Sequence, residues 1–472
     1  MSNHKAEFND VGGAGENASR RARCLKLALF CAVVALGVVL VVLLLTPPAE
    51  RSSAPTKSKP VPKKTAVPGP TVALATSPAE IPNEELQAEL VQEIEALQSR
   101  FPQSPHALHV AAGAYVKLHQ TARAGELWRK CIELNPRHLG PRLGLATLMS
   151  EKGEDAKAVE MLEKALAEGC SSAELYYRLA SAHSKVGDVE KAEAVIQAGV
   201  EAFPGVAINW LLLGQTQNQL QQYEAAEQSL LKAVELGEKS SEVYFALANA
   251  CQRQGKVEEA TEYREQFSEL KKKETGPSKG KPFQAIYQQA LRPVVVSTLT
   301  SSAAIHAEQG RDAAAERLFL RANALAPDNR QVLDELVTYY RKRARGADAM
   351  VVQERLVELQ PEHVIYHLNL ASIASHMGDW KTAESALEHA RKLAPDHVLP
   401  YIGLAQVRLQ AGDLAEARQF AERSIERRPT AQGYAVLAVI CERQGEMEAA
   451  KKARREAGRL ASSGPRTVER SP

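Results

Sequence analysis

Alanine returns every 34 residues along most of this chain. It occupies the twentieth position of ten 34-residue frames, although alanine is a minority of the residues. Five frames run without insertion to residue 274, and five more follow after a break, with one residue deleted before the last. The alanines are Ala124, Ala158, Ala192, Ala226, Ala260, Ala315, Ala349, Ala383, Ala417 and Ala450. A strict period of this length predicts a tandem array of one supersecondary unit.

Other positions of the frame are restricted in the same way. The eighth residue is alanine or glycine in nine of the ten frames, the seventh is mostly leucine, the fifteenth is often glycine and the thirty-second is often proline. Two antiparallel helices approach closely only where small residues meet, so positions eight and twenty indicate one helix crossing. Glycine permits the turn between the helices, and proline ends the second one. The frame therefore predicts a repeated helix-turn-helix unit.

This unit resembles the tetratricopeptide repeat in its length, in its small residues at positions eight and twenty, and in its proline at thirty-two. The resemblance covers two arrays of five units, 105–274 and 296–464. Individual units depart from the pattern, because Cys170, Glu238 and Lys272 stand where it has proline. A chain of this family is expected to be all-α, an α-solenoid of helix pairs wound into a right-handed superhelix.

Two further helical segments fall outside the ten units. The amphipathic stretch within 83–104 ends in phase with the repeat prolines, which predicts a second helix without its first, capping the array. The region 275–295 holds a breaker-rich linker and another half-unit helix, which is predicted to end at Arg292-Pro293. A capping role for both half-units is preferred, and continuous stacking of the two arrays is the alternative.

Leu27 to Leu45 is a run of nineteen residues without a charged side chain. As a helix it would span roughly 28 Å, close to the hydrocarbon thickness of a bilayer. The run is too long for a signal peptide, and no small-residue cleavage pattern closes it. Residues 27–46 are therefore predicted to be a transmembrane helix. Basic residues in the short polar tail 1–26 directly precede it and favour a cytoplasmic N-terminus, although lysines also follow it.

Residues 47–82 are rich in proline, serine and lysine and carry no sustained apolar period. This composition predicts a disordered linker that holds the repeats away from the bilayer. Residues 465–472 are likewise predicted to be a disordered tail.

The sequence predicts no enzyme. Glycine-rich phosphate loops, the nucleophile elbow and the zinc-protease motif are absent from it. The pairs His106/His109 and His363/His367 have a helical spacing that suits a metal, but neither brings a third ligand. A net charge of +2 does not indicate nucleic-acid binding, because binding to phosphates needs an excess of positive charge. No catalytic residue, cofactor, metal or nucleic-acid partner is therefore expected.

The six cysteines include no C-x-x-C pair, and their spacing suits neither a zinc site nor a compact disulfide framework. The spacing does not decide whether Cys131, Cys170, Cys251 or Cys441 is oxidised.

In the repeat family, positions two, five, nine, twelve and thirteen of the first helix line the concave groove of the solenoid. Amide and hydroxyl side chains there can bind the backbone of an extended peptide. The predicted peptide-binding groove of the first array holds Tyr177, Ser181, Lys185, Gln215, Asn218, Asn249, Gln252 and Arg253. The second array holds Thr338, Arg341, Lys342, Ser372, His376 and Gln406. Chaperone-binding relatives hold a carboxylate with a Lys–Asn pair that is missing here, so that mechanism is not expected.

Together these features predict a membrane-anchored scaffold or adaptor that binds other proteins, in the assembly or maintenance of an envelope complex. The layout is similar to bacterial inner-membrane proteins with one N-terminal span and a periplasmic repeat domain. Two alternatives stand beside it. One is a targeting or import receptor with cytoplasmic repeats, and the other is a non-catalytic subunit of a membrane-associated biosynthetic or secretion complex.

Overall fold

The computed structural model describes residues 69–274 and 283–462. The predicted transmembrane helix 27–46, and the tails 1–26 and 465–472, lie outside these ranges. Within the described ranges, no helix is both long and apolar enough to cross a membrane.

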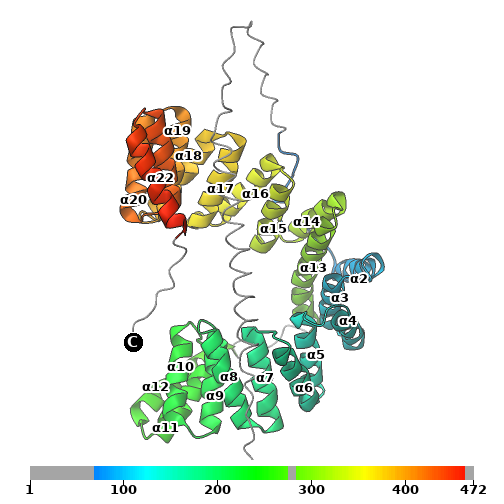
Figure 1. Cartoon of the computed structure of the whole chain (residues 1–472). Coiled ribbons are helices and arrows are strands. Elements are labelled where there is room, and N and C mark those ends of the chain that lie inside the picture. The colour runs from blue at the N-terminus through cyan, green and yellow to red at the C-terminus, as the bar shows by residue number, and fades with distance from the viewer. Residues whose placement is uncertain (1–68, 275–282, 463–472) are drawn as a thin grey trace, which may run out of the picture. The chain divides into compact units, whose positions relative to one another are not determined.

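The described residues form a succession of helices, two to each predicted unit (Figure 1). Helix α2 (Asn83–Arg100) precedes the first array. The first array consists of α3 (Pro105–Lys117), α4 (Thr121–Leu134), α5 (Leu139–Glu151), α6 (Asp155–Ala167), α7 (Ala173–Val186), α8 (Val189–Ala202), α9 (Ala207–Gln219), α10 (Tyr223–Glu235), α11 (Ser241–Arg253) and α12 (Val257–Glu274). The second array consists of α13 (Phe283–Glu308), α14 (Asp312–Leu325), α15 (Arg330–Lys342), α16 (Gly346–Leu359), α17 (Val364–Met377), α18 (Trp380–Leu393), α19 (Val398–Ala411), α20 (Leu414–Arg427), α21 (Ala431–Arg443) and α22 (Met447–Ser462). From α3 onward, odd-numbered helices are the first helices of their units.

The helix crossings lie where the repeat frame predicts them. All ten alanines at position twenty are at most 1% exposed. Gly214, at position eight, shows how closely the helices approach: a Cβ atom there would lie 2.5 Å from Cγ of Leu230 and 3.0 Å from the carbonyl oxygen of Ala226. The burial of these small residues confirms the predicted register.

The turn inside each unit requires a left-handed residue at position fifteen. Seven units have glycine there, with φ between 68° and 92°. In the other three units, His119, Gln221 and Ala344 adopt φ of 58°, 62° and 56°. The turn geometry is therefore common to all ten units, and three of them hold it with a residue that a left-handed backbone disfavours.

Helix α13 differs from the sequence prediction. It runs unbroken from Phe283 to Glu308 with Pro293 inside it, where a half-unit helix was expected to end at Arg292-Pro293. A proline removes one backbone hydrogen bond, but a helix continues through it when tertiary packing holds the turns on both sides. Leu291, Val295 and Leu299 provide that packing, since each is at most 4% exposed.

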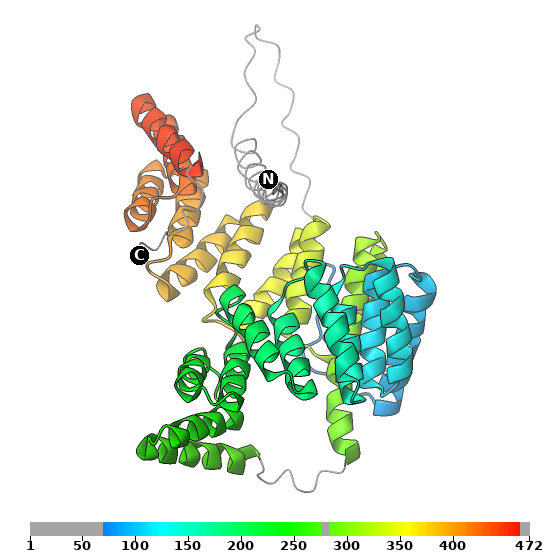
Figure 2. The ribbon, with the colours of Figure 1, turned by 60° about the horizontal axis from the view of Figure 1, so that its bottom comes forward.

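The two arrays do not stack in chain order. Among the described helices α12 packs only on α11, whereas α13 packs on α2 and α3 at the N-terminal end of the first array. Both ribbon views show α13 beside α2 and α3 (Figures 1 and 2). Leu86, Leu90 and Ile94 of α2 belong to a core that continues into α13 to α17. Helix α2 is therefore an internal element and not the terminal cap that the sequence predicts.

The residue at position twenty-four differs in the two units on which no further described helix pair packs, those that end in α12 and α22. Every other unit buries this side chain to 6% exposure or less, as Leu162, Ile196 and Phe319 illustrate. In α12 and α22 the position holds Arg264 and Arg454, both exposed. An exposed arginine there stands in place of the apolar side chain that a further unit would cover, and polar end units keep repeat arrays soluble. The second array packs instead on α2 and α3.

The end of the predicted disordered linker is ordered. Residues 69–82, here called the strap, run without helix or strand along the second array and lead into α2. The apolar side chains of Val72, Leu74 and Ile81 are partly buried against the core of α13 to α17. The prediction of disorder throughout 47–82 is therefore wrong for 69–82, because this stretch contains apolar residues that find a surface to cover.

Candidate functional site

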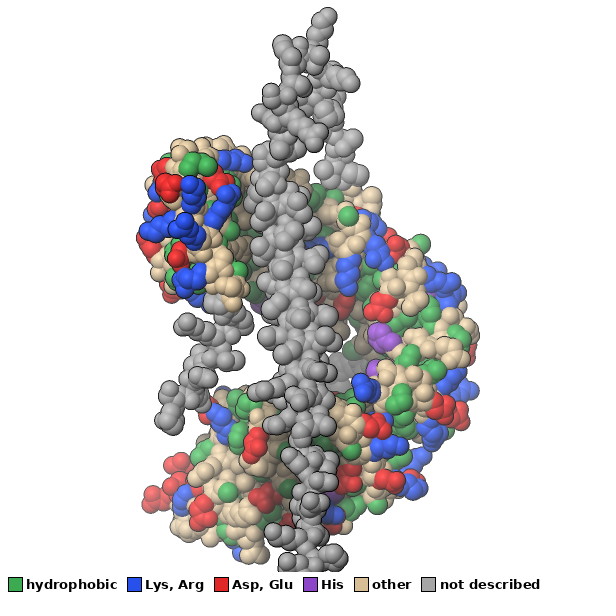
Figure 3. All heavy atoms as spheres, in the orientation of Figure 1, with side chains coloured by type: hydrophobic (Ala, Val, Ile, Leu, Met, Phe, Trp, Pro, Cys, Tyr) green, Lys and Arg blue, Asp and Glu red, His purple; other side chains and the backbone are tan. Residues whose placement is uncertain are grey.

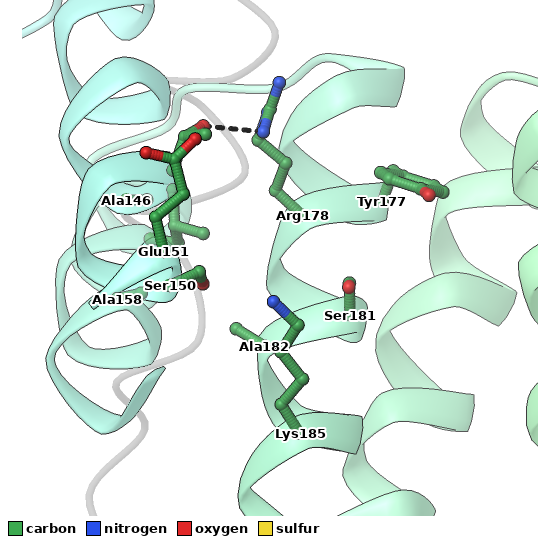
Figure 4. A pocket seen from close by; sticks show the side chains of 11 residues that line it. Ala146, Ser150, Glu151, Ala158, Tyr177, Arg178, Ser181, Ala182 and Lys185 are labelled. Carbon is green, nitrogen blue, oxygen red and sulfur yellow. Dashed lines mark hydrogen bonds between the residues drawn. The ribbon is translucent and has the colours of Figure 1, made fainter. Parts of the chain in front are cut away.

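A cavity of about 180 Å³ lies between the second and third units of the first array (Figure 4). Its floor is apolar and consists of Ala146, Ala158, Leu162 and Ala182. Ala146 and Ala158 are the helix-crossing residues of the second unit, and Leu162 is its buried position twenty-four, so the floor is part of the close-packed core. The cavity therefore has a rigid base.

The rim of the cavity is polar and comes mainly from the first helices α5 and α7. It consists of Thr147, Ser150, Glu151, Tyr177, Arg178, Ser181 and Lys185. Figure 4 shows Ser150 and Glu151 on one side of the cavity, with Arg178 and Lys185 on the other. Hydroxyl groups both donate and accept hydrogen bonds, whereas the two cations only donate. Such a rim can satisfy both the N–H and C=O groups of a bound backbone.

Contacts across the two units hold the rim in place. One Nη of Arg178 donates to Oγ1 of Thr147 at 2.6 Å, and the other lies 2.7 Å from a carboxylate oxygen of Glu174. Oγ of Ser150 donates to Asp155 at 2.6 Å, and Nζ of Lys185 lies 3.7 Å from the same carboxylate oxygen. The cations are thus balanced by neighbouring carboxylates, and the rim is preorganised rather than strongly positive.

The size of the cavity limits what it can hold. Small-molecule and cofactor sites usually enclose about 300–1,000 Å³, whereas this cavity holds about 180 Å³. An apolar floor of this size has room for one side chain of a peptide, and the polar rim has donors and acceptors that could meet its backbone. The geometry favours a peptide over a cofactor.

The structure brings only part of the predicted groove into this cavity. Tyr177, Ser181 and Lys185 line it. The other predicted residues, Gln215, Asn218, Asn249, Gln252 and Arg253, lie on α9 and α11 beyond it.

Two of the predicted groove residues also serve the array itself. Nδ2 of Asn218 donates to the carbonyl of Ala246 in the next unit at 3.0 Å. Oε1 of Gln252 accepts from Arg264 at 3.0 Å. These amides connect neighbouring helices, so their side chains are less available to a ligand than those of Asn249 and Arg253, which are exposed.

The predicted residues of the second array lie on α15, α17 and α19. Thr338, Arg341, Lys342 and His376 are exposed, and Ser372 and Gln406 are partly buried. A ring nitrogen of His376 lies 2.6 Å from the carbonyl oxygen of Ser372 in its own helix.

The predicted groove lacks four rim residues, Thr147, Ser150, Glu151 and Arg178. Thr147 and Ser150 occupy positions nine and twelve of the second unit, which are groove positions by the rule that identified Ser181. Glu151 is at position thirteen of the second unit, the position that Lys185 has in the third. Applying that rule to the second unit as well as the third would have found Thr147, Ser150 and Glu151. Arg178 is at position six, outside the rule, and no signal in the frame identifies it.

The histidine pairs have partners other than metals. Nε1 of Trp128 donates to Nδ1 of His109 at 3.0 Å, and burial lowers the pKa of His109 to about 4. A ring nitrogen of His367 lies 2.7 Å from the carbonyl oxygen of Pro361. Within the described ranges, no group of three or more histidine, cysteine or acidic residues is placed to hold a metal ion.

The cysteines of the two arrays are free thiols. Cys131, Cys251 and Cys441 are buried, and Cys170 is partly buried. Burial raises the pKa of the Cys131 and Cys251 thiols to about 11. Since the thiolate is the reactive form, these two cysteines are inert near neutral pH.

Acidic and basic side chains are interspersed over most of the face in Figure 3, and basic ones gather at the end formed by α20 and α22. Lys451, Lys452, Arg454 and Arg455 of α22 are exposed there. Three of the cations of α22 are paired with glutamates, as Arg454 is with Glu442.

Comparison with protein families gives matches to models described as tetratricopeptide repeat. They cover residues 143–207, 177–241, 243–278, 362–430 and 404–465. No curated protein matches the sequence.

Among solved structures, the chain is similar to "Crystal structure of MamA", with 20% identity and a TM-score of 0.32 over 34% of this chain and 95% of that one. It is also similar to "MamA 41-end from Desulfovibrio magneticus RS-1", with 19% identity and a TM-score of 0.33 over 37% of this chain and 98% of that one.

Proposed function

Because the chain belongs to the tetratricopeptide repeat family, we propose that it is a protein-binding scaffold whose first-array groove holds an extended segment of a partner protein. The observation that carries the proposal is the cavity between the second and third units, with its apolar floor and its rim of hydroxyls and paired cations. Tandem helix pairs present such grooves along one face, so neighbouring units can add further contacts. The proposal assigns no catalytic residue and no cofactor.

The proposal includes a membrane anchor at residues 27–46. It is supported by the nineteen uncharged residues from Leu27 to Leu45 and by the basic residues that precede them. The scaffold would then act at a bacterial inner membrane, with its N-terminus in the cytoplasm and its repeats in the periplasm, in the assembly or maintenance of an envelope complex.

Two lysines provide a matched test of the groove. Lys185 lies on the rim of the cavity and is 51% exposed, whereas Lys191 lies on the second helix α8 and is 67% exposed. Each is replaced in turn by a photo-crosslinking amino acid in the full-length chain, which is then irradiated in its native membranes. Crosslinks to a partner are expected from position 185 and not from 191. Equal crosslinking from both positions would contradict the groove assignment.

The side of the membrane is tested separately. Protease is added to intact spheroplasts and to lysed ones, and the repeat domain is detected with an antibody. Digestion in intact spheroplasts is expected for periplasmic repeats. Protection until lysis would instead favour the receptor with cytoplasmic repeats, and release of the whole chain into the soluble fraction would refute the anchor.

A further inference from the structure

The strap contacts the second array as an extended peptide would. Side chains alternate in exposure over 71–74: Thr71 and Ala73 are exposed, while Val72 and Leu74 are partly buried. Alternation of this kind is typical of an extended backbone lying on an apolar surface. The strap is therefore bound by one face, with the other face in solvent.

Asp348 on α16 binds the start of the strap. One of its carboxylate oxygens accepts from the backbone N–H of Thr71 at 2.6 Å and from that of Val72 at 2.8 Å. Nη2 of Arg345 donates to the hydroxyl of Thr71 at 2.7 Å. The side chain of Asp348 is only 6% exposed. Two consecutive amides on one buried carboxylate are a strong, charge-assisted form of backbone recognition.

Arg345 is itself held firmly. It lies 2.6 Å from Asp348 and 2.7 Å from Glu316, and its guanidinium carbon lies 4.6 Å from the ring centre of Tyr340. These contacts orient the carboxylate of Asp348 without using any atom of the strap. The clamp formed by Asp348 and Arg345 is therefore a property of the array.

Three further contacts hold the strap along α13 and α14. The backbone N–H of Ala75 donates to Oδ1 of Asn323 at 2.9 Å, and that of Ala79 donates to the carbonyl of Ala324 at 2.8 Å. Nη1 of Arg292 donates to the carbonyl of Ala79 at 2.9 Å. Each of these contacts reaches the strap at a backbone atom, so the array recognises the main chain and the direction of the segment more than its side chains.

We propose that α14, α16 and the adjoining part of α13 form a second peptide-binding site, and that the strap is its resident ligand, bound in cis and exchangeable. The ligand class is an extended segment with two consecutive free N–H groups and small apolar side chains at alternate positions. An empty site would leave the buried groups of Asp348 and Asn323 without these donors, which costs free energy. The array therefore favours the occupied state.

Exchange has a consequence that rests on the proposed membrane anchor. Release of the strap adds about fourteen residues to the tether, which extends its reach by at most roughly 50 Å. Occupation of the second site by another segment would thus let the repeats move further from the bilayer.

The test uses the full-length chain in detergent and a fluorescent peptide with the sequence of residues 69–82. In the released variant, Val72→Asp with Leu74→Asp, one carboxylate close to Asp348 and another against the apolar core expel the strap and leave the residues of the site unchanged. The labelled peptide is expected to bind this variant at least tenfold more tightly than it binds the wild-type chain, whose site is filled. Adding Asp348→Ala to the released variant is the control and should abolish binding.

Hydrogen exchange of the strap amides shows whether the strap has left, and exchange of α15 shows whether the array is still folded. Thr71→Pro with Val72→Pro is the second released variant, because it removes both donors to Asp348. Failure of the peptide to bind a folded chain with a released strap would overturn the proposal. Binding that does not depend on Asp348 would also overturn it. The assay uses neither the first-array groove nor the anchor, so its outcome is independent of the proposed function.

Discussion

The Gly214→Ala substitution sets helix propensity against packing. Propensity alone would make it stabilising, whereas the close helix crossing would make it destabilising. Most other units have alanine at this position, and alanine is the better helix former by about 1 kcal/mol. A Cβ at Gly214 would nevertheless lie 2.5 Å from Cγ of Leu230, where ordinary contact begins at 3.4 Å, and 3.0 Å from the backbone oxygen of Ala226. Neither atom is the flexible end of a side chain. Overpacking of a core costs about 1–3 kcal/mol, and this contact belongs in the upper part of that range. We expect Gly214→Ala to destabilise its unit by about 1–2 kcal/mol net.

Gly113 is the matched control. It lies in α3, one position further along its unit, and a Cβ there would meet nothing within 4 Å. Gly113→Ala should therefore stabilise its helix by about 0.5–1 kcal/mol. Each substitution is made in the full-length chain, and hydrogen exchange is followed in its own unit. Since about 1.4 kcal/mol corresponds to a tenfold change, amides of α9 and α10 should exchange about five to thirty times faster in Gly214→Ala. Amides of α3 should exchange more slowly in Gly113→Ala.

Shortening Leu230 should rescue the Gly214→Ala substitution. In a Leu230→Ala background the clashing branch is gone, and Gly214→Ala should then become neutral or stabilising. Slower exchange in α9 and α10 for Gly214→Ala alone would refute the close approach at this crossing.

Three further predictions follow from the same structure. Ala344→Gly should stabilise the second helix pair of 296–464, α15 with α16, by about 0.5–1 kcal/mol, because Ala344 holds a φ of 56°; a lower melting temperature would contradict the turn assignment. Ala226→Leu should destabilise by about 1–3 kcal/mol, because Ala226 is 0% exposed at a crossing; unchanged denaturant unfolding would mean that the register is wrong. The pKa of His109 is lowered to about 4 by burial and by nearby His138, so unfolding favours its protonation. Its contribution to stability is present above pH 6.5 and is lost as the pH falls from 6.5 towards 4. The melting temperature is measured across this pH range, and a His109→Gln variant whose melting temperature falls as steeply as that of the wild-type chain would rule this out.

The repeat frame predicted the helix pairs because the packing that requires small residues lies within each unit. Position twenty must be small wherever two helices cross, so Ala192 and its equivalents mark every unit without reference to the rest of the chain. Glycine predicted the left-handed turn in seven units. At His119 the residue type gives no such signal, because the flanking helices impose the left-handed conformation on it.

The junction between the arrays could not be predicted from the frame alone, since it joins residues far apart in the sequence. One signal was nevertheless present: Arg264 stands where other units bury a side chain, and it indicates that no unit stacks on α12. The strap was missed because the proline- and lysine-rich composition of 47–82 masked the alternating apolar residues Val72 and Leu74. The rim residue Arg178 depends on how adjacent units pack, which one unit's pattern does not contain.

The central claim is that the second array continues the solenoid from the N-terminal end of the first, through α2. Glu89 of α2 and Arg321 of α14 test it, because they lie 232 positions apart and form two hydrogen bonds of 2.8 Å each. Charge reversal of either residue alone, Glu89→Arg or Arg321→Glu, places like charges together and should lower the melting temperature of the full-length chain.

The exchanged pair, Glu89→Arg with Arg321→Glu, should recover most of the loss. The pair is partly exposed, at 36% for Arg321 and 24% for Glu89, so we expect a coupling free energy of about 0.5–1 kcal/mol. Recovery in the exchanged pair would show that α2 and α14 touch. Simple addition of the two single losses would contradict the junction and the order of helices derived from it.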